Sequence, residues 1–75
     1  MQSYSITVTN DEFKSTSEQD ARDLDDAVRS ALEGALNVGV EQVLTGKPLF
    51  GATVEITHSN HLARFLVTVG VSPLK

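Results

Sequence analysis

The chain has 75 residues, no cysteine and a formal net charge of −4. A chain of this length forms one small domain, and the lack of cysteine excludes disulfide bonds and thiolate zinc sites. The 6 basic residues are scattered along the sequence, whereas nucleic-acid binding needs them clustered. We therefore expect a single domain over residues 1–75 that binds no nucleic acid.

The N-terminal residues contain neither a basic start nor an apolar core of the kind that signal peptides have. No apolar run approaches the roughly 20 residues that a membrane-spanning helix needs. The absence of cysteine fits a reducing compartment. We expect a cytoplasmic protein without a membrane segment.

Residues 4–9 alternate between apolar and polar side chains, which predicts a half-buried strand. The Asn10-Asp11 pair that follows tolerates the left-handed conformations of a two-residue turn. If the chain turns there, Thr9 faces Glu12 and residues 12–17 form a second, weak strand. The sequence leaves open whether residues 12–17 form a strand.

Residues 23–39 carry apolar side chains at spacings of three and four, which predicts an amphipathic helix. The expected buried face consists of Leu24, Ala27, Val28, Ala31, Ala35 and Val38, widened by Leu32 and Leu36. Its three alanines should let the helix lie close to a sheet.

The ends of this helix carry recognisable signals. Asp23 is the expected N-cap, and Asp26 three residues later resembles a capping box with aspartate in place of glutamate. Ser17 with Asp20 is an alternative start. Gly39 is the expected C-terminal stop.

Residues 40–51 predict one more helical turn and then a loop interrupted by glycine and proline. Leu49 and Phe50 lie in that loop. They either cover the open end of the core, which we favour, or face a partner, so both are interface candidates.

The stretches "ATVEITH" and "LARFLVTVGV" alternate and predict a C-terminal hairpin. Pairing Ile56 with Ala63 and Val54 with Phe65 keeps both apolar sets on one face. The opposite face is mostly polar, and its exception, Leu66, is a third interface candidate. The whole order predicts an α+β fold, in which a ββαββ antiparallel sheet of three to four strands has one main helix packed on one face.

That register leaves either Ser59-Asn60 as a two-residue loop or residues 58–61 as a four-residue loop. In the first case His58 and His61 stand opposite each other with Cβ atoms about 5 Å apart, close enough to bind one divalent ion. A metal site usually has three or four protein ligands, and Glu55 points to the other face. We interpret the pair as a polar hairpin end and keep both histidines as weak metal candidates.

Other chemical motifs are missing from the sequence. The acidic residues between positions 18 and 26 lack the glycine and the spacing of a calcium loop. No serine lies in a nucleophile-elbow motif, and "GKPLFG" is not a phosphate-binding loop. We expect no catalytic residue, no cofactor and no enzymatic activity.

The run "DLDDAVRSALEGAL", between the "SITV" strand and the "GATVEI" and "ARFLVTV" strands, resembles a group of small uncharacterised bacterial proteins. This chain lacks their acidic-glycine turn before the helix. No activity is established for that group, so the resemblance implies a fold only. A second resemblance, through Asp26-Ala27 and Ala31-Leu32, is to the antitoxin half of HicB-type toxin–antitoxin pairs, although their "F-P-D-L-P-G" segment is missing here.

We expect a small non-enzymatic protein that acts through protein–protein contact, with a homodimer as one form of that contact. The contact would use residues 46–51 or a sheet edge. The alternatives are an antitoxin-like inhibitor of a nuclease toxin and a weak metal-binding protein that uses the histidine pair.

Overall fold

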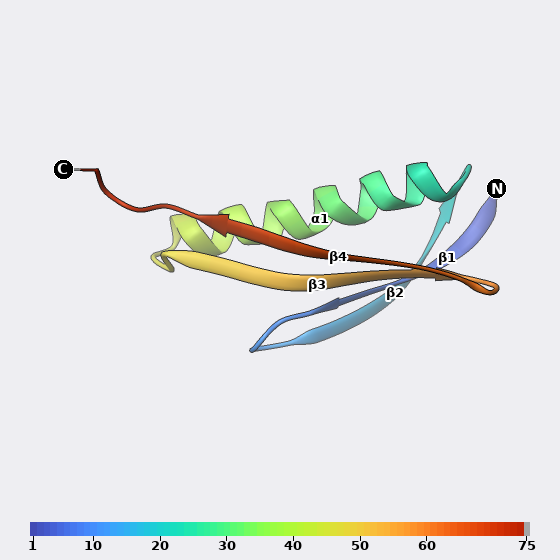
Figure 1. Cartoon of the computed structure of the whole chain (residues 1–75), viewed down its shortest axis with the longest axis horizontal. Coiled ribbons are helices and arrows are strands. Elements are labelled where there is room, and N and C mark those ends of the chain that lie inside the picture. Colours follow the sequence, from blue (N-terminus) through green and yellow to red (C-terminus); the bar gives the residue numbers. More distant parts are fainter. Residues whose placement is uncertain (75) are drawn as a thin grey trace.

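The structure is a computed structural model that describes residues 1–74. It contains β1 (Gln2–Thr9), β2 (Lys14–Ala21), α1 (Leu24–Leu44), β3 (Leu49–His58) and β4 (His61–Gly70). The four strands form one antiparallel sheet in the order β2-β1-β3-β4. The helix runs along one face of this sheet (Figure 1), so the predicted α+β fold with ββαββ order is confirmed.

The core lies between α1 and the inner face of the sheet. The helix buries only small residues there: Ala27, Ala31, Ala35 and Gly39. Opposite them, Val54 and Ile56 of β3 have no exposed surface. Because the contacting helix side chains are so small, the helix backbone can approach the sheet closely.

The predicted buried face of the helix is partly wrong. Leu24, Leu36 and Val38 are 38%, 43% and 41% exposed. The helix contacts the sheet along its alanine row, so the larger aliphatic side chains lie on its flanks and are only partly covered.

The helix lies over β3 and β4 rather than over the centre of the sheet, and it touches β1 and β2 much less. As a result, an open groove of about 220 Å³ lies between α1 and the N-terminal hairpin formed by β1 and β2. Its walls include Ser15 and Ser17 of β2 and Ser30 and Gly34 of α1, which are too small to close it.

The predicted turn between the first two strands is wrong. Thr9 pairs with Lys14, not with Glu12, and the four residues 10–13 form the loop. The Asn10 side chain accepts hydrogen bonds from the backbone N–H groups of Glu12 and Phe13 at 2.9 and 3.0 Å. This Asx-type turn uses the asparagine side chain instead of a left-handed backbone, and it needs the longer loop. Strand β2 therefore starts two residues later than expected and extends beyond residue 17 to Ala21, which is buried.

The helix starts at the predicted N-cap. The Asp23 carboxylate accepts a hydrogen bond from the Asp26 N–H at 2.8 Å. The Asp26 carboxylate accepts one from the Arg22 N–H at 3.1 Å, so the reciprocal bond of the capping box is displaced by one residue. The alternative start at Ser17 and Asp20 is wrong, because both residues belong to β2.

The helix does not stop at Gly39. It continues to Leu44, and Gly46 after it adopts a φ of 121°. Gly39 lies where the helix crosses the sheet: a Cβ built there would meet Phe50 Cδ2 and Val69 Cγ2 at 2.8 Å. The glycine is therefore needed for close packing, and the stop signal is the later glycine.

The predicted C-terminal hairpin is confirmed. Ile56 pairs with Ala63 and Val54 pairs with Phe65, as the apolar alternation requires. The loop expected up to residue 51 is wrong at its end, because β3 begins at Leu49. None of the helical structure within residues 1–74 combines the length and apolarity that crossing a membrane would require.

Candidate functional site

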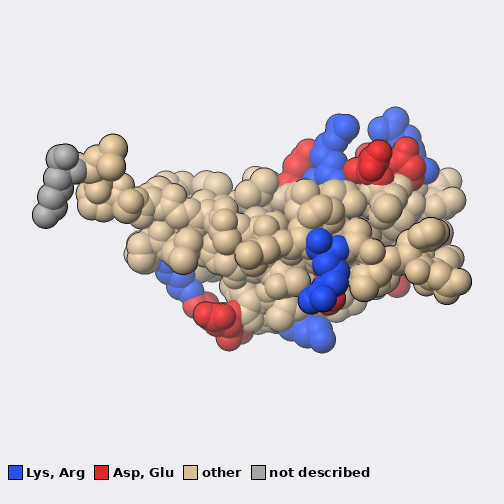
Figure 2. Space-filling view, in the orientation of Figure 1, with Lys and Arg blue, Asp and Glu red and all other residues tan. Residues whose placement is uncertain are grey.

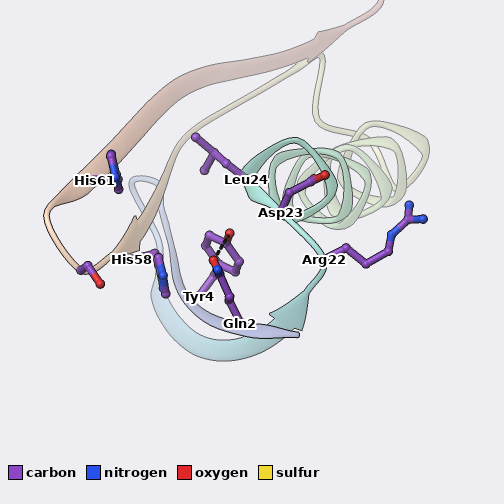
Figure 3. A pocket seen from close by; sticks show the side chains of 8 residues that line it. Gln2, Tyr4, Arg22, Asp23, Leu24, His58 and His61 are labelled. Carbon is purple, nitrogen blue, oxygen red and sulfur yellow. Dashed lines mark hydrogen bonds between the residues drawn. The ribbon is translucent and has the colours of Figure 1, made fainter.

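The two histidines close the C-terminal hairpin. Ser59-Asn60 is a two-residue loop, and His58 pairs directly with His61, which decides between the two loops that the sequence left open. Both lie on the inner face of the sheet, since side chains two residues apart share a face and Ile56 is buried there. Figure 3 shows them at the end of the sheet where α1 begins.

The His58 ring is held in one orientation by the backbone of the neighbouring strand. Its Nδ1 lies 2.9 Å from the carbonyl oxygen of Ser3. A carbonyl can only accept a hydrogen bond, so Nδ1 carries the proton and donates it. In the neutral ring, Nε2 then has a free lone pair, and no hydrogen bond to this atom is found within residues 1–74.

Tyr4 supports His58 from one side. The two ring centroids are 4.7 Å apart with an angle of 38° between the planes. Tyr4 is 3% exposed, and its hydroxyl donates a hydrogen bond to Gln2 Oε1 at 3.0 Å, drawn as the dashed line in Figure 3. A tilted aromatic contact of this kind restrains the imidazole ring.

These residues line an open pocket of about 430 Å³ between the hairpin end and the start of α1. Arg22, Asp23 and Leu24 form its helical side. In Figure 3 the Arg22 side chain extends away from the histidines, and it forms an ion pair with Asp26 at 3.7 Å. The hydrogen bond from the Arg22 N–H, together with the Arg22 charge, lowers the pKa of Asp26 below its ordinary value of 3.8.

Three side chains that can ligate a metal line the pocket, His58, His61 and Asp23, and the two histidines are direct cross-strand partners. Within residues 1–74, no three side chains from His, Cys, Asp and Glu gather closely enough to share an ion. The sequence did not reveal the support of His58 by Tyr4 and the Ser3 carbonyl, because this depends on the pairing of β1 with β3.

The second candidate site is the free edge of β4. This strand lies at the border of the sheet and is ten residues long. Alternate residues of an edge strand direct their N–H and C=O groups away from the sheet, where another chain can bind them. On its outer face, Leu62 and Leu66 are 59% and 76% exposed. Arg64, the one charged residue of β4, pairs with Glu55 of β3 at 3.0 Å.

The three interface candidates have different positions. Leu66 is exposed on the outer face, as expected. Leu49 and Phe50 lie in β3 on opposite faces: Leu49 is 66% exposed, whereas Phe50 is 3% exposed and packs against Gly39. Phe50 thus covers the core, and Leu49 and Leu66 remain available to a partner.

The helix adds apolar surface on the same side as β4. Leu36 and Val40 are 43% and 45% exposed, and each lies about 160° around the helix from Val38, which faces the groove above β1 and β2. They therefore lie on the flank away from that groove. Figure 2 shows this side of the molecule as mostly uncharged apart from one basic side chain near its centre, with the other acidic and basic residues over one half of the helix and along the lower border.

Comparison with protein-family models, with curated proteins and with solved structures gives no match for this chain. The two sites must therefore be interpreted from their own chemistry.

Proposed function

We propose that the protein is a non-enzymatic contact protein that forms a homodimer through the free edge of β4. The observation that carries this proposal is the unprotected edge itself. A ten-residue strand with exposed leucines and one charge borders the sheet. Natural proteins normally protect such an edge with charges, proline, a bulge or a covering segment, because it pairs readily with another chain.

The charge pattern of the strand suits a second copy of itself. In an antiparallel pair related by a two-fold axis at Leu66, Leu66 faces its own copy and Arg64 faces Thr68. On the inner face, Phe65 then faces Val67. No like charges meet, and Arg64 is already neutralised by Glu55 within its own subunit.

The same pairing also brings together the apolar helix flanks. Leu36 and Val40 lie on the helix flank away from the groove, so in a continuous eight-stranded sheet we expect two such flanks to face each other across the axis. Burial of this aliphatic surface would stabilise the dimer by about 25 cal/mol per Å² removed from water. Strand pairing would give the register, and the leucines and valines would give the affinity.

Sedimentation equilibrium tests the dimer. The wild-type chain should sediment as a dimer, and Leu66→Lys should weaken association by at least about tenfold, because two lysines then face each other at the axis. Thr16→Lys is the matched control: it adds the same charge to the same face of the sheet, but on the opposite edge strand β2. A wild-type chain that remains monomeric at high concentration contradicts the proposal.

Cysteine cross-linking tests the register of the strand pair. The sequence contains no cysteine, so an introduced cysteine can form a disulfide only with its own copy. Leu66→Cys should form an intersubunit disulfide, because directly opposite Cα atoms in a sheet are about 5 Å apart. Thr68→Cys should not, because its copy then lies about 13 Å away along the strand. Efficient cross-linking at position 68 alone would place the axis elsewhere and contradict the Leu66 register.

The lack of cysteine supports a reducing, cytoplasmic setting for this contact. The antitoxin-like alternative depends on the identity of a partner protein, so it stays a prediction. A toxin gene beside the gene for this chain would favour it.

A further inference from the structure

We propose that His58 and His61 together bind one late first-row divalent metal ion, with copper(II) bound most tightly. The site lies in the pocket at the hairpin end and does not depend on the proposed dimer. It is distinct from a structural zinc site, because two histidines hold the ion and the remaining positions are open to water or to an added ligand; among residues 1–74 no third side chain joins them.

The strand pairing places both imidazoles on one side of the hairpin. His58 and His61 are direct cross-strand partners, so their Cβ atoms are about 5 Å apart and both side chains leave the same face of the sheet. Each metal–nitrogen bond is about 2 Å long. Rotation of the exposed His61 side chain would therefore let both rings bind one ion without a change of the backbone.

The environment of His58 shares one feature with that of metal-ligating histidines. Its Nδ1 donates to the Ser3 carbonyl oxygen, which fixes the tautomer and leaves Nε2 as the coordinating atom. Metal-ligating histidines usually make such an outer hydrogen bond, which orients the ring and raises its basicity. Tyr4, whose ring lies against that of His58, further restricts the rotation of the imidazole.

The charged groups around the pocket do not oppose a cation. Asp23 lines the pocket, and Arg22 is directed away from the histidines and paired with Asp26. No lysine lines this pocket in the part of the chain that the structure describes. The formal charge of −4 also favours a positive ligand over the molecule as a whole.

The ligand set decides the class of metal. Imidazole nitrogen without thiolate suits copper, nickel and zinc, whereas calcium and magnesium prefer oxygen ligands. Among divalent ions, affinity for a given nitrogen site is highest for copper. Two imidazoles and added water fit the tetragonal geometry that copper(II) prefers.

The test is a copper(II) titration of the untagged chain, followed by electron paramagnetic resonance. We expect one ion per chain with hyperfine coupling to two imidazole nitrogens, and weaker binding of nickel and zinc. His61→Gln should lower the copper affinity by at least about tenfold. Loss of a mere hydrogen-bond partner of a ligand already has an effect of this size, and this variant removes a ligand itself. His61 is exposed and has no packing role, so this variant should fold normally.

The double variant His58→Gln/His61→Gln is the blank, because the chain contains only 2 histidines. Equal copper affinity in this variant, or in His61→Gln, would overturn the site and leave only adventitious binding elsewhere. One ion shared by two chains would also overturn it.

Two further measurements separate this site from the dimer and from a merely polar hairpin end. Leu66→Lys should bind copper like the wild type, because Leu66 is remote from the pocket lining. Nitrogen-15 NMR of the metal-free chain should show neutral His58 protonated at Nδ1. Protonation at Nε2 instead would contradict the orientation on which the site depends.

Discussion

The two hairpins have the same architecture but different roles in the molecule. The inner face of β4 carries Ala63, Phe65, Val67 and Val69, and α1 lies over it. The inner face of β2 carries Ser15, Ser17 and Gln19 before the buried Ala21, and α1 covers it less. The C-terminal hairpin therefore packs most extensively on the helix, and the N-terminal hairpin contributes fewer buried core residues, Tyr4, Ile6 and Ala21.

The same contrast appears at the two sheet edges. Strand β2 has eight residues with Lys14, Glu18 and Asp20 on its outer face, so its charges discourage pairing with another chain. Strand β4 has ten residues and the single charge of Arg64. One edge is thus protected and the other is left open, which is the basis of the proposed dimer.

The largest expected effect comes from the same truncation at two paired positions. Val54 of β3 is fully buried, whereas its cross-strand partner Val8 of β1 is only partly buried. Val54→Ala should lower the free energy of unfolding by about 2–3 kcal/mol, from lost burial and a residual cavity. Val8→Ala should cost about 1 kcal/mol or less, because the groove beside it is already open.

Urea denaturation at one fixed protein concentration measures both variants, since dimerisation makes apparent stability depend on concentration. Equal losses at the two positions would mean that the N-terminal hairpin contributes to the core as much as the C-terminal one.

A second pair of variants should change stability in opposite directions. A methyl group at Gly39 would meet Phe50 and Val69 at 2.8 Å, whereas a methyl group at Gly34 would meet nothing within 4 Å. Gly39→Ala should destabilise by about 1–2 kcal/mol, because overpacking outweighs the gain in helix propensity. Gly34→Ala should stabilise by about 0.5–1 kcal/mol through propensity alone.

Thermal unfolding followed by circular dichroism checks this pair. Stabilisation by both alanines would show that the helix is not held tightly on the C-terminal hairpin. Destabilisation by both would show that the groove beside Gly34 is closed in solution.

The sequence predicted those parts of the fold that depend on side-chain periodicity. Alternation fixed the register of Val54 with Phe65, because a shift by one residue would expose the whole apolar set. Spacing of three and four found the helix, and Asp23 marked its start. The prediction from sequence failed at Gly39, because a glycine that ends a helix cannot be distinguished in one sequence from a glycine that permits close packing.

The candidate sites were predicted only as far as neighbouring residues determine them. The His58–His61 pair follows from local register, so the sequence found it. The contacts of His58 with Ser3 and Tyr4 join residues more than fifty positions apart, and no local pattern encodes them. The open edge of β4 could not be assigned either, because strand order is a property of the whole sheet.

The smallest expected effects concern the two hairpin turns, which are built differently. Asn10 holds the N-terminal loop with its side chain, whereas Ser59 begins the C-terminal loop with a φ of 52°. Asn10→Ala removes the acceptor of two N–H groups and should cost about 1 kcal/mol. Ser59→Gly should stabilise by about 0.5 kcal/mol, because glycine adopts the left-handed region without strain. The gain is small, since glycine also loses more chain entropy on folding.

Hydrogen exchange of the strand amides distinguishes local from global effects of the two changes. With Asn10→Ala, faster exchange should be confined to β1 and β2, since α1 packs mainly on the C-terminal hairpin, far from that loop in the chain. With Ser59→Gly, slower exchange should extend to β3 and β4 and to the helix packed on them. Equal acceleration of all four strands by Asn10→Ala would instead mean that the two hairpins unfold as one unit, and that the contrast between them is structural but not energetic.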